Sequence, residues 1–175
     1  MSLLNISFLN EAINEKQLLA PNEVLNHVRK RLIENVSQDG GQDGMDGILV
    51  CFDKTKNQIT YAAAHNKPIV IREGQMLEMQ CDKMPVGQGE RKESFNLFTL
   101  ELKPNDTLYL YTDGFADQFG GPKGKKFKYK QLNELLLSIN DKSLKEQHTI
   151  LHDKFQEWKG NLEQVDDVCI IGIRL

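Results

Sequence analysis

The sequence lacks the features that mark several large classes of protein. No apolar run approaches the roughly 20 residues that a helix needs to cross a bilayer, and no basic segment followed by an apolar one opens the chain as a secretion signal would. The net charge of −3 is too small for a general binder of polyanions, because nucleic-acid affinity depends largely on Lys and Arg neutralising phosphates. We therefore expect a cytoplasmic protein that contacts neither nucleic acid nor, through this domain, a membrane.

Cysteine is scarce and scattered. The three cysteines, Cys51, Cys81 and Cys169, are far apart, odd in number and form no CxxC pair. This spacing argues against a disulfide framework and against a zinc ribbon. Because Cys51 and Cys169 stand inside apolar runs, we expect both to be reduced residues of the core.

What is present fits one soluble globular domain over residues 1–175, with 39% hydrophobic and 27% charged residues. Apolar residues at helical spacing predict helices over residues 3–16 and 21–36. Strand-length runs separated by turn residues predict two hairpins, at 47–52 with 58–64 and at 68–72 with 76–79. Further strands are expected at 94–102, 107–111 and 168–174, further helices at 129–139 and 143–158, and a loop at 112–128. Clustered rather than alternating elements indicate an α+β fold with antiparallel strands.

Acidic residues beside glycine or beside another acid stand at the ends of predicted strands. Asp113-Gly114 follows the strand that ends at Tyr111, and Asp166-Asp167 precedes the last strand. Adjacent carboxylates repel each other unless a cation compensates, and Mg²⁺ or Mn²⁺ prefers such oxygen ligands. Residues 43–47 (DGMDG) form a third site of this kind.

Each of these sites also has an ordinary structural interpretation. Asp-Gly pairs are common in turns, and paired acids can simply cap or solvate a strand. If the acids are only structural, Asp113 and Asp166 should lie far apart in the fold. If they bind a metal, the fold must bring them together.

A series of short segments occurs in an order and spacing that is fairly specific. Residues 63–68 (AAHNKP) resemble an AGHNP loop, residues 84–87 (MPVG) a PLG turn, and residues 103–107 (KPNDT) the lead-in to the next strand. Residues 110–117 (LYTDGFAD) resemble a YTDG signature, and residues 166–168 (DDV) a closing DD or DN motif. In this order the segments resemble the C-terminal portion of a SpoIIE/RsbU-type metal-dependent protein serine/threonine phosphatase of the PPM/PP2C superfamily.

The resemblance implies a layered β-sandwich flanked by helices (α-β-β-α) and a reaction at two divalent cations, Mn²⁺ or Mg²⁺. The ions would activate a water that attacks the phosphorus in line, and paired ions stabilise charge on the attacking and leaving oxygens. By this resemblance Asp113 and Asp166 are the expected metal ligands, with Gly114 and Asp167 as further candidates. We expect no catalytic residue beyond the metal ligands.

The resemblance also implies a biological setting. The expected substrate is a phosphorylated regulatory protein, a STAS-type anti-sigma factor antagonist, in partner-switching or two-component signalling. A sensor domain would precede this one in the full-length protein. Apolar surface left open by a shortened domain makes a homodimer possible.

The first metal motif of the family has no counterpart in the chain. That Asp-Gly or Asp-x-x-Gly-His-Gly segment supplies the groups that bridge the two ions, and it should lie before the first long helix. Residues 1–4 (MSLL) instead lead directly into that helix, and Asp43 and Asp46 align with a different strand. The resemblance therefore implies that the N-terminal strands and the first metal motif are missing, and we expect weak or absent metal binding and little activity. The alternative is a non-catalytic protein-binding module, a pseudophosphatase, on the same scaffold.

Two other patterns in the sequence are a run of basic residues and a pair of histidines. The basic run that includes Lys123, Lys125 and Lys126 is either a solvated loop or a docking surface for an acidic or phosphorylated partner. His148 and His152 have the four-residue spacing of a zincin helix but lack the Glu that follows the first His in that motif. We expect no metal at this pair.

Overall fold

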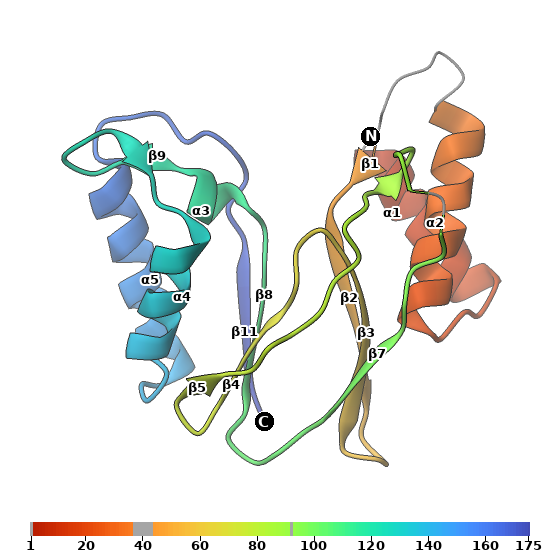
Figure 1. Cartoon of the computed structure of the whole chain (residues 1–175), viewed down its shortest axis with the longest axis horizontal. Coiled ribbons are helices and arrows are strands. Elements are labelled where there is room, and N and C mark those ends of the chain that lie inside the picture. The colour runs from red at the N-terminus through yellow and green to blue at the C-terminus, as the bar shows by residue number, and fades with distance from the viewer. Residues whose placement is uncertain (1, 37–43, 92) are drawn as a thin grey trace. The chain divides into compact units, whose positions relative to one another are not determined.

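The computed structural model describes residues 2–36, 44–91 and 93–175. The chain divides into two compact units: Met1–Lys67 with Gln80–Leu102, and Pro68–Met79 with Lys103–Leu175. Each unit combines helices with antiparallel strands, as the α+β prediction requires (Figure 1). Within the described ranges no helix is both long and apolar enough to span a bilayer.

The first unit is built on a three-stranded antiparallel sheet. Its order is β2 (Gly47–Asp53), β3 (Gln58–Ala64) and β7 (Phe98–Glu101). The predicted hairpin of the first two strands is confirmed, with Gly47 opposite Ala64. A smaller pair joins β1 (Gly44–Met45) to β6 (Val86–Gly87).

Helices cover this sheet on one side (Figure 1). The predicted first helix divides into α1 (Ser2–Asn10) and a π-helical turn η1 (Glu11–Glu15), and α2 (Pro21–Val36) has the predicted bounds. The amphipathic face of α2 is what the apolar spacing predicted. The buried core consists of Phe8, Ala12, Val24, Leu25, Val28, Leu32, Ala62, Ala64, Met84, Val86 and Phe95.

The second unit holds a four-stranded antiparallel sheet that carries both acidic motifs at its strand ends. Its order is β11 (Ile170–Arg174), β8 (Thr107–Tyr111), β4 (Ile69–Arg72) and β5 (Gln75–Met76). The predicted hairpin of β4 and β5 is confirmed, although β5 is shorter than expected. The turn at 103–106 joins strands of two different sheets, since β7 pairs with β3 while β8 pairs with β4 and β11.

Two long helices pack on this second sheet (Figure 1). They are α4 (Tyr129–Ser138) and α5 (Leu144–Lys159), close to the predicted helices. The core between them and the sheet contains Ile69, Ile71, Tyr109, Phe115, Phe127, Leu132, Leu136, Ile139, Leu151 and Phe155. The segment predicted as a loop at 112–128 instead contains α3 (Gly114–Asp117) and a small hairpin of β9 (Phe119–Gly120) with β10 (Lys125–Lys126).

The core assignment of two cysteines was wrong. All three cysteines are free, but Cys51 and Cys169 are exposed. Cys51 lies beside the exposed Phe52 near the end of β2, and Cys169 precedes β11. An apolar run indicates a strand, but it does not say which of its residues the packed face covers.

The start of α5 offers a stability prediction. Ser143 accepts a hydrogen bond from the Glu146 N–H at 3.3 Å, and the Glu146 carboxylate accepts one from the Ser143 N–H at 2.9 Å, which completes a capping box. We expect Ser143→Ala to lower the free energy of unfolding by about 1 kcal/mol, because a helix N–H loses its acceptor. Urea denaturation measures this loss. Because Ser143→Asp can still cap the helix, we expect its free energy of unfolding to stay close to that of the wild type. Equal losses in both variants would contradict a capping role.

Candidate active site

The pairing of β8 with β11 brings the two acidic motifs to the same end of the sheet. The strands are antiparallel, with Tyr111 opposite Ile170. The residues that follow β8 therefore lie next to the residues that precede β11. Asp113 belongs to the first group, and Asp166 and Asp167 to the second.

Thr112 ties these two segments together. Its backbone N–H donates to the Cys169 carbonyl at 3.0 Å. Its hydroxyl donates to the Asp167 carbonyl at 2.8 Å and accepts from the Cys169 N–H at 2.9 Å. The ladder of β8 and β11 thus continues through a side chain up to the acidic pair.

Gly114 allows the closest approach of the two motifs. The residue is buried, and a Cβ added there would collide with the carbonyl oxygen of Asp167 and lie 3.2 Å from that of Asp166. Only glycine gives the backbone this room. The motifs are therefore in contact, and the expectation from a purely structural role, that Asp113 and Asp166 lie far apart, is wrong.

The three acids differ in how they are held. Asp113 is half-buried, and its carbonyl accepts from the Asp117 N–H at 2.9 Å in α3. Asp166 is exposed, and its carboxylate accepts from the Asp167 N–H at 2.7 Å. Asp167 is also exposed, and its carbonyl is the group that Thr112 anchors.

This donor set suits a hard divalent cation only in part. Carboxylate and carbonyl oxygens are the ligands that Mg²⁺ and Mn²⁺ prefer, and Asp113 and Asp166 provide them at one end of the sheet. In the described ranges, however, no group of three or more His, Cys, Asp or Glu residues could hold a metal ion. Asp43 lies outside the described residues, and Asp46 pairs with His65 at 2.7 Å in the first unit.

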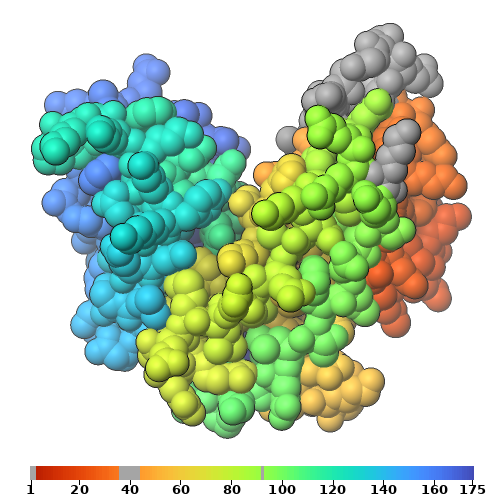
Figure 2. Space-filling model, in the orientation of Figure 1, coloured from red at the N-terminus to blue at the C-terminus, as the bar shows by residue number. Residues whose placement is uncertain are grey.

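The predicted docking lysines lie on the β9–β10 hairpin, directly after α3. Lys123 and Lys125 are exposed, and the hairpin lies at the surface of the second unit (Figure 2). Lys126 forms an ion pair with Asp117 at 2.9 Å and lies 5.8 Å from the centre of the Phe119 ring. The hairpin is thus anchored on the helix that begins at Gly114.

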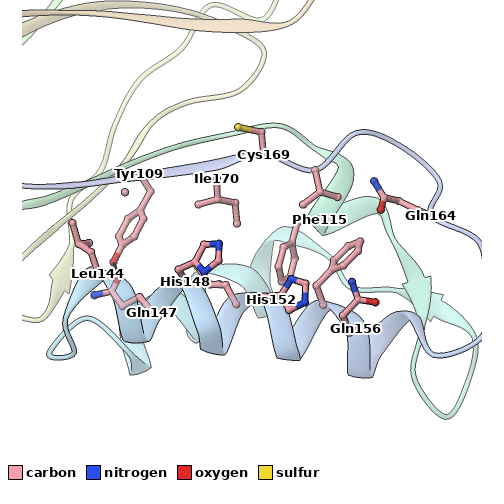
Figure 3. Close-up of a pocket in the computed structure, with 14 residues that line it drawn as sticks. Tyr109, Phe115, Leu144, Gln147, His148, His152, Gln156, Gln164, Cys169 and Ile170 are labelled. Atoms are coloured by element: carbon pink, nitrogen blue, oxygen red, sulfur yellow. Dashed lines mark hydrogen bonds between the residues drawn. The ribbon is translucent and has the colours of Figure 1, made fainter.

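A groove of about 550 Å³ lies in the same unit between α5 and the segment around β11. Figure 3 shows His148 on α5 beside Ile170 and His152 further along the helix beside Phe115, while Cys169 points away from the helix. The two histidines face the groove without a third metal-binding residue beside them, within the described part of the chain.

Comparison with known proteins decides the family. The family model described as Stage II sporulation protein E (SpoIIE) matches residues 1–175. The chain belongs to the SpoIIE family. None of the curated proteins matches it.

Solved structures share the fold of this SpoIIE-family chain. The SiaA-PP2C domain of Pseudomonas aeruginosa is 25% identical, with a TM-score of 0.88 over 99% of this chain and 68% of that chain. The SpoIIE phosphatase domain of Bacillus subtilis, presoaked with Mn, is 14% identical, with a TM-score of 0.59 over 98% of this chain and 71% of that one. A Mycobacterium tuberculosis structure of RsbU and RsbW domains is 18% identical, with a TM-score of 0.71 over 97% of this chain and 46% of that one.

These comparisons confirm the family and the fold that the motifs indicated. The chain belongs to the SpoIIE family and has a PP2C-like fold of the predicted α+β class. The metal-ligand roles of Asp113 and Asp166 stay predictions, as does the assignment of residues 1–175 to a single domain.

Proposed function

We propose that this domain hydrolyses phosphoserine or phosphothreonine on a bacterial regulatory protein in the cytoplasm, using Mn²⁺ or Mg²⁺. The observation that carries the proposal is the meeting of Asp113-Gly114 with Asp166-Asp167 at one end of the β8–β11 pair. Membership of a phosphatase family supports the reaction type. Two acidic motifs that are 53 residues apart in sequence would not need to touch if each were only a turn.

The chain's own residues would hold the catalytic ions through oxygen. The carboxylates of Asp113 and Asp166 would bind the metal, Gly114 would let the backbone approach it, and Asp167 could add a further oxygen. A bound divalent ion lowers the pKa of its water and stabilises charge on the phosphoryl oxygens. Thr112 and Gly114 keep the two acidic segments close together, which would bring the donors near each other before a metal binds.

We propose a phosphorylated STAS-type anti-sigma factor antagonist as the substrate, in partner-switching or two-component signalling. The similarity to RsbU supports a regulatory substrate. The exposed Lys123 and Lys125 follow α3 on the hairpin, where they could attract an acidic or phosphorylated surface.

Charge reversal tests this docking surface. We expect Lys125→Glu or Lys123→Glu to raise the KM for an acidic phosphoprotein about threefold, as the loss of an exposed charge pair would, and to leave kcat unchanged. The KM for p-nitrophenyl phosphate should not change. Lys145→Glu, on the exposed side of α5, is the matched control. Equal effects at position 145 would show that only net charge matters.

One observation favours a non-catalytic protein-binding module as the second candidate. The described residues contain no cluster of three or more His, Cys, Asp or Glu side chains that could hold a metal ion. We therefore expect slow hydrolysis by this chain. Phosphate release from a phosphoserine protein, measured with Mn²⁺ and again with EDTA, separates the candidates: a slow rate that requires Mn²⁺ supports the enzyme, and no release with intact binding of the phosphoprotein supports the module.

A further inference from the structure

Gln118 is a fully buried amide whose hydrogen bonds connect the two acidic motifs. It follows α3, which begins just after Asp113, and its side chain has no solvent exposure. Its Nε2 donates to the Glu163 carbonyl at 2.9 Å, and its Oε1 accepts from the Val165 N–H at 3.1 Å. The amide therefore spans from the Asp113 segment to the residues immediately before Asp166.

The position of Gln118 is itself fixed from two sides. Its backbone carbonyl accepts from the Trp158 indole N–H and from the Phe127 N–H, both at 3.0 Å. Its Nε2 also donates to the Phe119 carbonyl at 2.9 Å. A buried amide with its donor and acceptor both used has one favourable orientation, since turning it over would set its oxygen against two carbonyl oxygens and its NH₂ group against the Val165 N–H.

The segment that Gln118 holds has little packing of its own. Residues 161–167 are all exposed, including Leu162 at 48% and Val165 at 55%. Apolar burial therefore contributes little to fixing this segment, and hydrogen bonds must supply most of its order. Gln118 binds it before Asp166, and Thr112 binds it after Asp166, at Asp167.

We propose that Gln118 is a positioning residue for the metal site: it fixes the segment that carries Asp166 against the segment that carries Asp113. This inference rests on the proposed function. Gln118 acts through the backbone of residues 163 and 165, without itself touching metal or substrate. Gln118 would orient the metal ligand Asp166 without binding the metal itself. Loss of such an orienting group typically weakens metal affinity 10–100-fold.

Another buried glutamine in the same unit provides a matched control. Gln147 is 2% exposed, accepts from the Tyr109 hydroxyl at 2.7 Å and donates to the Lys142 carbonyl at 3.0 Å. It supports the connection between α4 and α5 and forms its hydrogen bonds away from the acidic segments. Gln118→Met and Gln147→Met remove equally buried amides of similar size, so both should lower the unfolding stability.

Calorimetric titration with Mn²⁺ alone, on the 175-residue chain, tests the proposal. We expect Gln118→Met to weaken Mn²⁺ binding about tenfold or more, and Gln147→Met to leave it unchanged. Hydrogen exchange should show lost protection at the Val165 amide in Gln118→Met only. If Gln118→Met does not fold, Gln118→Asn, whose amide is too short to bridge, replaces it with the same expectation.

The failures of the two proposals are distinguishable. Unchanged Mn²⁺ affinity in Gln118→Met, or an equal loss in Gln147→Met, would overturn the positioning role and leave the metal site standing. No Mn²⁺ binding by the wild-type chain would overturn the metal site and, with it, the role of Gln118 in placing its ligands.

Discussion

Asp113→Asn and Asp166→Asn should each weaken Mn²⁺ binding by about 100-fold or more. Removing a group that only supports a ligand costs 10–100-fold in metal affinity, and loss of the ligand itself should cost at least as much. The amide keeps the size of the carboxylate but loses its charge, which a hard cation needs. Calorimetric titration of each variant with Mn²⁺ measures the loss.

A third carboxylate in the same unit controls for charge. Asp153 is exposed on α5, outside the acidic segments, so Asp153→Asn should leave Mn²⁺ binding unchanged. Because asparagine is nearly isosteric with aspartate, the urea unfolding curves of all three variants should stay close to that of the wild type. Equal Mn²⁺ affinity in the wild type and in Asp113→Asn would show that Asp113 is not a metal ligand.

Asp106→Asn should lower the free energy of unfolding by about 3–5 kcal/mol, the usual cost of removing one partner of a buried ion pair. Asp106 is fully buried, and its two carboxylate oxygens accept from Arg72 at 2.9 and 2.7 Å. The backbone N–H of Lys103 donates to it at 2.9 Å as well. The pair joins β4 to the turn before β8, so its loss should disturb the strand that leads to Asp113.

Urea denaturation gives the size of this effect, and an exposed pair gives the baseline. Lys154 and Glu157 are 2.9 Å apart on the surface of α5. Exposed pairs contribute about 0–1 kcal/mol, so Glu157→Gln should change the unfolding free energy by less than about 1 kcal/mol. Similar losses in Asp106→Asn and Glu157→Gln would contradict a structural role for the buried pair.

The same pair gives stability a predictable dependence on pH. Burial would raise the pKa of Asp106, but the hydrogen bonds from Arg72 and from the Lys103 N–H outweigh it, and the net pKa is lowered. The folded state therefore binds this proton less readily than the unfolded state does. The stabilisation is present above the ordinary aspartate pKa of about 3.9 and is lost as the pH falls through the lowered folded-state value. Asp106→Asn should flatten this acid-side decline.

Local structure followed the sequence closely in this chain. The bounds of α2, β3 and β8 are those that the apolar patterns predicted. Such elements are set by periodicity and turn residues over short stretches of chain. Pairing between strands that are distant in sequence has no comparable local signal. The pairing of β8 with β11 could therefore not be predicted from the sequence and is seen only in the structure.

The sequence identified the residues of the candidate site, but it could not predict that they lie close together. Each acidic motif alone is compatible with a turn, and the close approach of Gly114 to the backbone of Asp166 and Asp167 is visible only in the structure. Gln118 gave no signal at all, because a buried amide and a solvated one are identical in sequence. Thr112 could have been suspected from its place beside Asp113, but its partners are 55 and 57 residues away in sequence.

Anomalous diffraction from crystals of this chain soaked in Mn²⁺ tests the central claim most directly. We predict a peak within bonding distance of carboxylate oxygens from both Asp113 and Asp166. A peak at another place, such as His148 and His152, with none at the two acids, would contradict the assignment of this sheet end as the metal site of the proposed phosphatase.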